Sequence, residues 1–139
     1  LDYTAMRRTA GGRALAALEG VQRMLAEAAM DVEIGRLLTM RAAAKLDQGG
    51  FARKEVSMAK VFVADTLHKA VDVALQLNGA RGYSEDTVLE WIYRYARQAR
   101  LVDGASEVHK MVIARHLAEG ADTFWDWNHL DRPKRSSGK

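Results

Sequence analysis

Apolar residues recur every three or four positions through most of this chain, and no proline interrupts the pattern. The one proline, Pro133, lies outside every such stretch. An α-helix places residues three and four apart on one face, whereas a proline in a helix interior kinks or breaks it. No window of more than four residues alternates apolar and polar residues as a half-buried strand would. The sequence therefore predicts an all-α fold built from long, uninterrupted helices.

Four helical segments are expected, with short connections between them. They span about residues 13–47, 52–77, 84–99 and 103–120. Gly49 and Gly50 end the first segment and Asn78-Gly79 ends the second, because these residues tolerate the backbone conformation that follows a helix. Ser84 can cap the third helix. Helices joined by short connections favour an antiparallel four-helix bundle.

The length of 139 residues suggests a single domain. We expect residues 1–120 to form the bundle. The segment 121–139 is expected to be a partly disordered tail, since apolar periodicity is lost after Trp127. The chain begins at Leu1 and not at Met, which is consistent with a piece of a longer protein.

Composition excludes several kinds of chemistry. The chain has no cysteine, which rules out disulfides, thiolate metal sites and cysteine nucleophiles. His109 and His116 are seven residues apart, too far to share an ion by i, i+4 spacing, so no metal is expected. No apolar run of about 18 residues and no signal peptide occur, so we expect neither a membrane span nor secretion. The expected location is the bacterial cytoplasm or, in a eukaryote, an organelle matrix.

Charge alone leaves the ligand open. The formal net charge is +3, and the basic residues gather towards both ends of the chain. A mild basic excess favours anionic ligands, such as a nucleotide pyrophosphate or nucleic acid. The alternative is a solvated surface that keeps the protein soluble.

Asp103 is the carboxylate best placed for chemistry. It precedes Gly104 at the expected start of the fourth helix, where the helix dipole stabilises a negative charge. Gly104 leaves space for a ligand beside it. Asp103 is therefore a candidate general base, and the alternative is that Asp103, or Ser106, is an ordinary helix N-cap.

Two further groups could bind an anion. The segment from Gln76 to Tyr83 reads Gln-Leu-Asn-Gly-Ala-Arg-Gly-Tyr, and glycines let a backbone approach a ligand closely. It lacks the preceding strand of a dinucleotide-binding fingerprint, so a helix C-cap and turn is the alternative. Arg8, beside Arg7, could hold a phosphate with two hydrogen bonds, or could be one of a solvated basic pair.

Taken together, these features resemble the C-terminal helical domain of the acyl-CoA dehydrogenases. Arg8-Thr-Ala-Gly-Gly12 is similar to the Arg-x-x-Phe-Gly of that family, and the 76–83 segment to its Gln-x-x-Gly-Gly-x-Gly-Tyr/Phe. The segment 54–60 resembles the motif that starts the second bundle helix. Arg94-Tyr-Ala96 followed by Asp103-Gly104 resembles Arg-Asp-Ala followed by the catalytic Glu-Gly. The resemblance covers about residues 3–117.

The resemblance implies FAD-dependent α,β-dehydrogenation of an acyl-CoA. Asp103 takes the place of the base that removes the α-proton, and Gly104 would help to shape the site for the substrate carbonyl. The residues that the resemblance assigns to FAD are Arg8, Gln76, Gly79, Ala80, Gly82, Ala105 and Ser106. Arg8, Gln76 and Gly79 would contact the pyrophosphate of FAD on a neighbouring subunit. The resemblance also implies a homodimer or tetramer, and an electron-transfer flavoprotein as electron acceptor.

The sequence departs from the family pattern at several positions. Asp103 stands where Glu is usual, Ala80 where a second Gly is usual, and Tyr95 where Asp is usual. Gly11 replaces Phe, and Glu19 replaces Gln at a position where a carboxylate would repel a pyrophosphate unless it faces away. These departures leave two alternatives open: a non-catalytic helical oligomerisation module and a basic nucleic-acid-binding bundle. The family builds its pockets from three domains, so this segment alone is expected to fold without activity.

Overall fold

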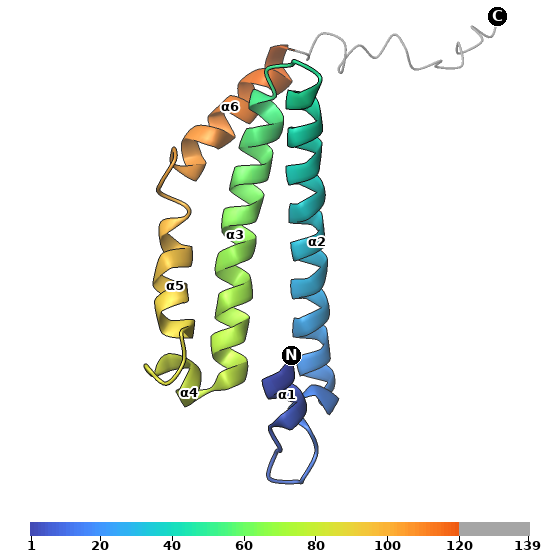
Figure 1. The fold of residues 1–139 in the computed structure, drawn as a ribbon, viewed down its shortest axis with the longest axis vertical. Coiled ribbons are helices and arrows are strands. Elements are labelled where there is room, and N and C mark those ends of the chain that lie inside the picture. Colours follow the sequence, from blue (N-terminus) through green and yellow to red (C-terminus); the bar gives the residue numbers. More distant parts are fainter. Residues whose placement is uncertain (120–139) are drawn as a thin grey trace, which may run out of the picture.

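The structure is a computed structural model that describes residues 1–119, and within them every regular element is a helix (Figure 1). The elements are α1 (Asp2–Met6), the 3-10 turn η1 (Leu15–Ala17), α2 (Glu19–Asp47), α3 (Arg53–Asn78), α4 (Ala80–Tyr83), α5 (Leu89–Gln98) and α6 (Ser106–Glu119). The all-α prediction is confirmed. The expected tail, 121–139, lies outside the described residues.

Helix α3 is the centre of the fold. It packs against α2 on one side and against α5 and α6 on the other, whereas α2 touches neither α5 nor α6 within the described chain. Figure 1 shows α5 and α6 following one another alongside α3, both running opposite to it. Three of the four helices predicted from the sequence therefore share the fourth, α3, as their central partner, and both sides of α3 can carry a site.

The buried core is small and made of small side chains. The buried apolar residues are Val21, Ala42, Ala52, Ala59, Ala64, Val71 and Ala96. Gly35 on α2 is also buried, and a Cβ there would lie 3.3 Å from a methyl carbon of Val63, so α2 and α3 meet closely at this point. Small residues at a helix contact shorten the distance between the helix axes.

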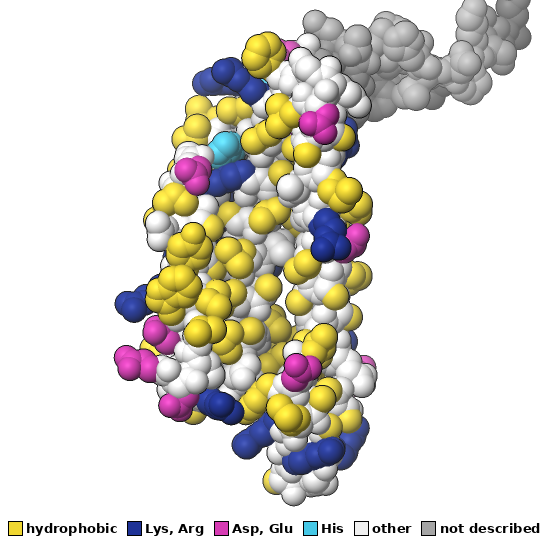
Figure 2. All heavy atoms as spheres, in the orientation of Figure 1, with side chains coloured by type: hydrophobic (Ala, Val, Ile, Leu, Met, Phe, Trp, Pro, Cys, Tyr) yellow, Lys and Arg dark blue, Asp and Glu magenta, His cyan; other side chains and the backbone are white. Residues whose placement is uncertain are grey.

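Large apolar side chains are left on the surface. Leu37 and Met40 on α2 and Trp91 on α5 keep 57%, 62% and 57% of their surface exposed. Figure 2 shows apolar side chains gathered along the face formed by α5 and α3. Apolar area of this extent is typical of a surface that meets another protein or domain. None of the helices within residues 1–119 combines the length and apolarity needed to cross a bilayer.

The first long helix starts later than predicted, at Glu19 and not at Arg13. The preceding segment folds back on itself: the Thr9 amide donates to the Arg13 carbonyl and the Leu15 amide to the Arg7 carbonyl, each at 2.8 Å. These bonds satisfy backbone groups that a helix would have used, so residues 13–18 form a bridge and a 3-10 turn.

The cap predicted at Ser84 is also wrong. Ser84 follows α4, a helical turn that the periodicity did not predict, and its hydroxyl donates to the Arg81 carbonyl at 2.9 Å. Helix α5 begins only at Leu89, whose amide donates to the hydroxyl of Thr87 at 3.3 Å. A serine that bonds to nearby backbone groups stabilises a turn in preference to a helix start, which moves the helix five residues along the chain.

Candidate functional site

The loop between α5 and α6 holds Asp103 in an unusual backbone conformation. Its φ is +55°, and it is the one non-glycine residue with a positive φ in the described part of the chain. Gly104 follows with a φ of +88°. Asp is one of the few side chains that tolerate the left-handed region, and glycine enters it without cost. These two residues turn the chain sharply before α6.

Neither Asp103 nor Ser106 caps α6, which corrects the alternative drawn from the sequence. Helix α6 starts at Ser106, and the Ala105 carbonyl accepts from the amides of Val108 and His109 at 2.9 and 3.2 Å. Ala105 is therefore the residue at the N-cap position. Asp103 lies two residues earlier, so its carboxylate remains available for another role.

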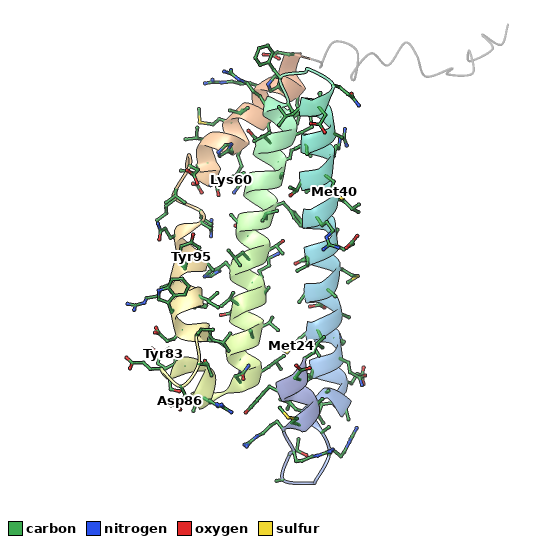
Figure 3. The ribbon with its side chains drawn as sticks, in the orientation of Figure 1. Met24, Met40, Lys60, Tyr83, Asp86 and Tyr95 are labelled. Atoms are coloured by element: carbon green, nitrogen blue, oxygen red, sulfur yellow. The ribbon has the colours of Figure 1, made fainter. Side chains whose placement is uncertain are left out.

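Side chains from α3 and α6 hold this loop. The Lys60 ammonium donates to the Gly104 carbonyl at 2.7 Å, and the Nε2 of His109 lies 3.1 Å from the Asp103 carbonyl oxygen. The Nδ1 of the same ring lies 3.0 Å from the hydroxyl of Ser57, which is buried on α3. Figure 3 marks Lys60 on the side of α3 that faces α5 and α6.

Asp103 borders a cavity of about 270 Å³ between α3 and α5. The cavity is lined by Lys60, Val63, Ala64, Leu67, Tyr95, Gln98, Ala99, Val102 and Asp103. Most of these side chains are apolar, and Asp103 contributes the one carboxylate among them. A carboxylate at the edge of an apolar cavity can accept a proton from a carbon acid bound there, provided the two groups come within hydrogen-bonding reach.

A second concavity, of about 730 Å³, lies at the other end of α3. It brings together four residues predicted to bind the cofactor: Arg8, Gln76, Gly79 and Ala80. Arg7 and Arg81 join them, and no Asp or Glu is among the residues that line it. Figure 2 shows Lys and Arg side chains at this end of the molecule. Three guanidinium groups without a carboxylate favour an anion.

The predicted site residues therefore fall into two groups. Lys60, which touches the Asp103 loop, and Gln76 are both on α3, sixteen residues apart, so about 24 Å of helix separates them. Glu19, which a pyrophosphate would repel, is not among the residues lining the Arg8 concavity. The chain presents one candidate site for proton transfer and one for anion binding.

The remaining predicted residues lie close to one of these groups. Ser106 is fully buried, and its hydroxyl lies 3.5 Å from the Lys60 ammonium. Ala105 is half-buried beside it. Gly82 is buried against α3, where a Cβ would come 2.8 Å from the Leu75 carbonyl oxygen, so helix packing alone requires a glycine there.

Sequence reasoning missed the residues that hold the Asp103 loop. It weighed His109 only as a metal ligand and Lys60 only as part of a helical motif. Ser57 and Lys60 are three apart on α3 and share a face. That spacing is a usable signal, but it does not show which loop the face meets.

The chain is similar to known proteins in sequence and in fold. The family model described as "Acyl-CoA dehydrogenase, C-terminal domain" matches residues 2–118. The chain belongs to the acyl-CoA dehydrogenase family. Its all-α structure matches the C-terminal domain fold of that family.

Individual relatives show the same likeness. Acyl-CoA dehydrogenase family member 11 of Gallus gallus is 37% identical over the whole of this chain, which covers 17% of that protein. A 3-(aryl)acrylate reductase of Clostridium sporogenes is 39% identical over 81% of the chain, covering 30% of the reductase. A solved acyl-CoA dehydrogenase from Geobacillus kaustophilus superposes with a TM-score of 0.79 at 32% identity, over 84% of this chain and 30% of that one. The chain thus spans less than a third of each relative.

Proposed function

We propose that this chain is the C-terminal domain of an FAD-dependent acyl-CoA dehydrogenase in which Asp103 is the base. The observation that carries the proposal is the placement of one carboxylate, on a loop of positive φ, at the edge of an apolar cavity. Asp103 also occupies the position at which the family resemblance expects the catalytic carboxylate.

The proposed reaction removes two hydrogens from the acyl chain. The carboxylate of Asp103 takes the α-proton of the acyl-CoA, and the C–H electron pair left on the α-carbon becomes part of the new α,β double bond. FAD, when bound, supplies the acceptor for the β-hydrogen, which leaves with its electron pair as a hydride. Gly104 follows Asp103 with a φ of +88°, and the resemblance assigns its backbone to the site for the thioester carbonyl. The product is a trans-2-enoyl-CoA.

The Arg8 concavity fits the pyrophosphate of FAD. Arg7, Arg8 and Arg81 supply guanidinium groups that can bind phosphate oxygens with two hydrogen bonds each. Gln76 adds an amide that can donate to the same oxygens. About 24 Å of α3 separates this concavity from the Asp103 loop. The two sites of one subunit can therefore contact two different flavin molecules. A flavin shared with a neighbouring subunit accounts for the two separate groups.

The remainder of the active site is expected outside this chain. The family resemblance implies two further domains, and the chain covers 17% and 30% of the two relatives described above. The isolated chain is therefore expected to show no dehydrogenase activity. One relative is named a reductase. That the reaction of this chain runs in the oxidative direction is therefore also part of the proposal.

The exposed apolar side chains support contacts with other domains and with other subunits. Leu37, Met40 and Trp91 leave apolar area for the other domains and for further copies in a homodimer or tetramer. An electron-transfer flavoprotein is the proposed electron acceptor. The proposed location is the bacterial cytoplasm or an organelle matrix.

The test compares Asp103→Asn with the wild type in the longer polypeptide that carries this chain, purified with its flavin. Acyl-CoAs from butanoyl-CoA to hexadecanoyl-CoA are added anaerobically, and bleaching of the flavin absorbance is followed. We expect the wild type to bleach and the variant to lose at least about 10³-fold in rate with its flavin still bound, because the general base is absent. Asp47→Asn removes an exposed carboxylate elsewhere and is the matched control.

Three results would contradict parts of the proposal. Equal bleaching by Asp103→Asn would show that another group is the base. A flavin that no acyl-CoA bleaches would move the chemistry to another substrate. A colourless protein would favour the non-catalytic helical module.

A further inference from the structure

Two consecutive carbonyl groups in the Asp103 loop are each held by a side chain. Lys60 donates to the carbonyl of Gly104 at 2.7 Å, and His109 contacts the carbonyl of Asp103 at 3.1 Å. Both side chains come from packed helices, α3 and α6, and neither needs to touch a ligand to make these bonds. Backbone bonds also hold the loop: the Ser106 amide donates to the Arg100 carbonyl at 3.0 Å, and the amides of Leu101 and Val102 donate to the Gln98 carbonyl at 2.8 and 3.2 Å.

The geometry determines which ring nitrogen of His109 carries the hydrogen. A carbonyl oxygen only accepts, so the contact with Asp103 requires a hydrogen on Nε2. In the neutral ring Nδ1 is then an acceptor, and it receives the hydrogen of the Ser57 hydroxyl at 3.0 Å. Ser57 is 3% exposed, and the bond to its hydroxyl sets the ring orientation, whereas the Asp103 carbonyl sets the tautomer.

The held conformation is one that an unrestrained loop would leave for much of the time. Asp tolerates the left-handed region better than most side chains, but other backbone conformations remain open to it. The ring of His109 also fills the space beside Gly104, where a Cβ would lie 2.9 Å from Nε2. The bonds from Lys60 and His109 stabilise the conformation in which Asp103 borders the apolar cavity.

We propose that Lys60 and His109 are positioning residues for the Asp103 carboxylate, with Ser57 fixing the orientation of the His109 ring. This inference rests on the proposed function, in which Asp103 is the base. A misplacement of about 1 Å in a reacting group can lower a rate on the order of 100-fold, although no contact with substrate is lost.

The experiment measures proton removal separately from hydride transfer. The flavin-loaded full polypeptide is incubated anaerobically in D₂O with butanoyl-, octanoyl- and hexadecanoyl-CoA, and exchange of the α-hydrogens is followed by NMR. Lys60→Met and His109→Ala are expected to lower the exchange rate roughly 10- to 100-fold. Flavin content is expected to stay within about twofold in both variants. KM is expected to stay within about twofold in His109→Ala, because His109 is not among the residues that line the cavity. His109→Gln, whose amide can still donate to the Asp103 carbonyl, should recover most of the rate.

Matched controls separate positioning from a general loss of structure. Lys69→Met removes a lysine that is 71% exposed on the same helix as Lys60, and His116→Ala removes a histidine on the same helix as His109. Both should exchange at the wild-type rate. If Lys60→Met and His109→Ala also match the wild type while Asp103→Asn is inactive, the inference is wrong and the proposed function stands.

Two further results have distinct meanings. If Asp103→Asn exchanges as fast as the wild type, the proposed function fails and the inference fails with it. The ¹⁵N shifts of the His109 ring test the geometry without any substrate. A hydrogen on Nε2 whose signal moves in Ser57→Ala supports the inference, whereas a neutral ring with its hydrogen on Nδ1 overturns it.

Discussion

The Asp103 loop and the 76–83 segment both depend on a glycine, but for different physical reasons. A Cβ at Gly104 would lie 2.9 Å from Nε2 of His109, and a Cβ at Gly82 would lie 2.8 Å from the Leu75 carbonyl oxygen. The distances are nearly equal, yet His109 can change rotamer whereas the α3 backbone cannot move alone. The glycine at 82 is therefore needed for packing, and the glycine at 104 for the hydrogen bond that holds the candidate base.

The two regions also differ in what makes them functional. The Asp103 cavity is mostly apolar, and its chemistry depends on the place of one carboxylate. The Arg8 concavity is lined by three arginines, and its affinity for an anion depends on charge. A small geometric change should damage the first region, whereas added salt should damage the second.

The largest effect on stability is expected for Gly82→Ala. The new methyl group meets backbone atoms of α3, so α4 must move away from it. We expect a loss of about 2–4 kcal/mol in the free energy of unfolding, measured by urea denaturation. Gly20→Ala, on α2 with no neighbour within 4 Å of its Cβ, is the control and should be neutral or slightly stabilising. An unchanged midpoint for Gly82→Ala would show that this contact is not tight.

Gly104→Ala should reduce catalysis more than stability. The methyl group displaces His109 from the Asp103 carbonyl, and the positive φ adds strain. We expect the α-hydrogen exchange rate to fall about 100-fold while the free energy of unfolding falls by about 1–2 kcal/mol. Gly49→Ala has a similar φ of +78° but no neighbour within 4 Å, so it reports the strain alone. Equal exchange rates in Gly104→Ala and Gly49→Ala would show that Gly104 is not needed for the hydrogen bond that holds the candidate base.

Arg8→Gln should weaken flavin retention about tenfold and reduce its dependence on salt. The variant removes a guanidinium from the arginine-lined concavity and leaves the Asp103 cavity intact. Flavin release would be followed by fluorescence at several salt concentrations. Arg36→Gln, exposed on α2 away from this concavity, is the control. Retention that is equal in both variants would place the pyrophosphate elsewhere.

The smallest effect is expected at the turn between α2 and α3, which serves as a reference outside both regions. The hydrogen bond from Lys45, at 2.8 Å, lowers the pKa of the Glu55 carboxyl below its ordinary value of 4.5, although burial opposes the shift. Its stabilisation is therefore present above pH 4.5 and lost as the pH falls through the lowered pKa. Glu55→Gln should lower the free energy of unfolding by about 0.5–1 kcal/mol at pH 7, measured by urea denaturation. Below the lowered pKa of Glu55, the substitution should leave the free energy of unfolding unchanged. A cost that does not change with pH would contradict this assignment.

Local sequence signals predicted the helix ends marked by glycine. Gly49 has a φ of +78° after α2, and Gly79 has a φ of +60° after α3, as expected where a helix stops. The same signals failed at Arg13 and Ser84, because distant or local hydrogen bonds there satisfied the backbone in another way. Periodicity reports which face a helix buries, not which residue begins it.

Apolar periodicity and the absence of internal proline determined the helical fold of this chain, because both act through neighbouring residues. The family motifs likewise pointed to Asp103 and Arg8 as functional residues. Only the tertiary structure decided that Lys60 and His109 hold the Asp103 loop, and that Arg7 and Arg81 join Arg8 around one concavity. Those contacts join residues from three helices, and their geometry depends on how the helices pack and not on the order of residues within any one of them.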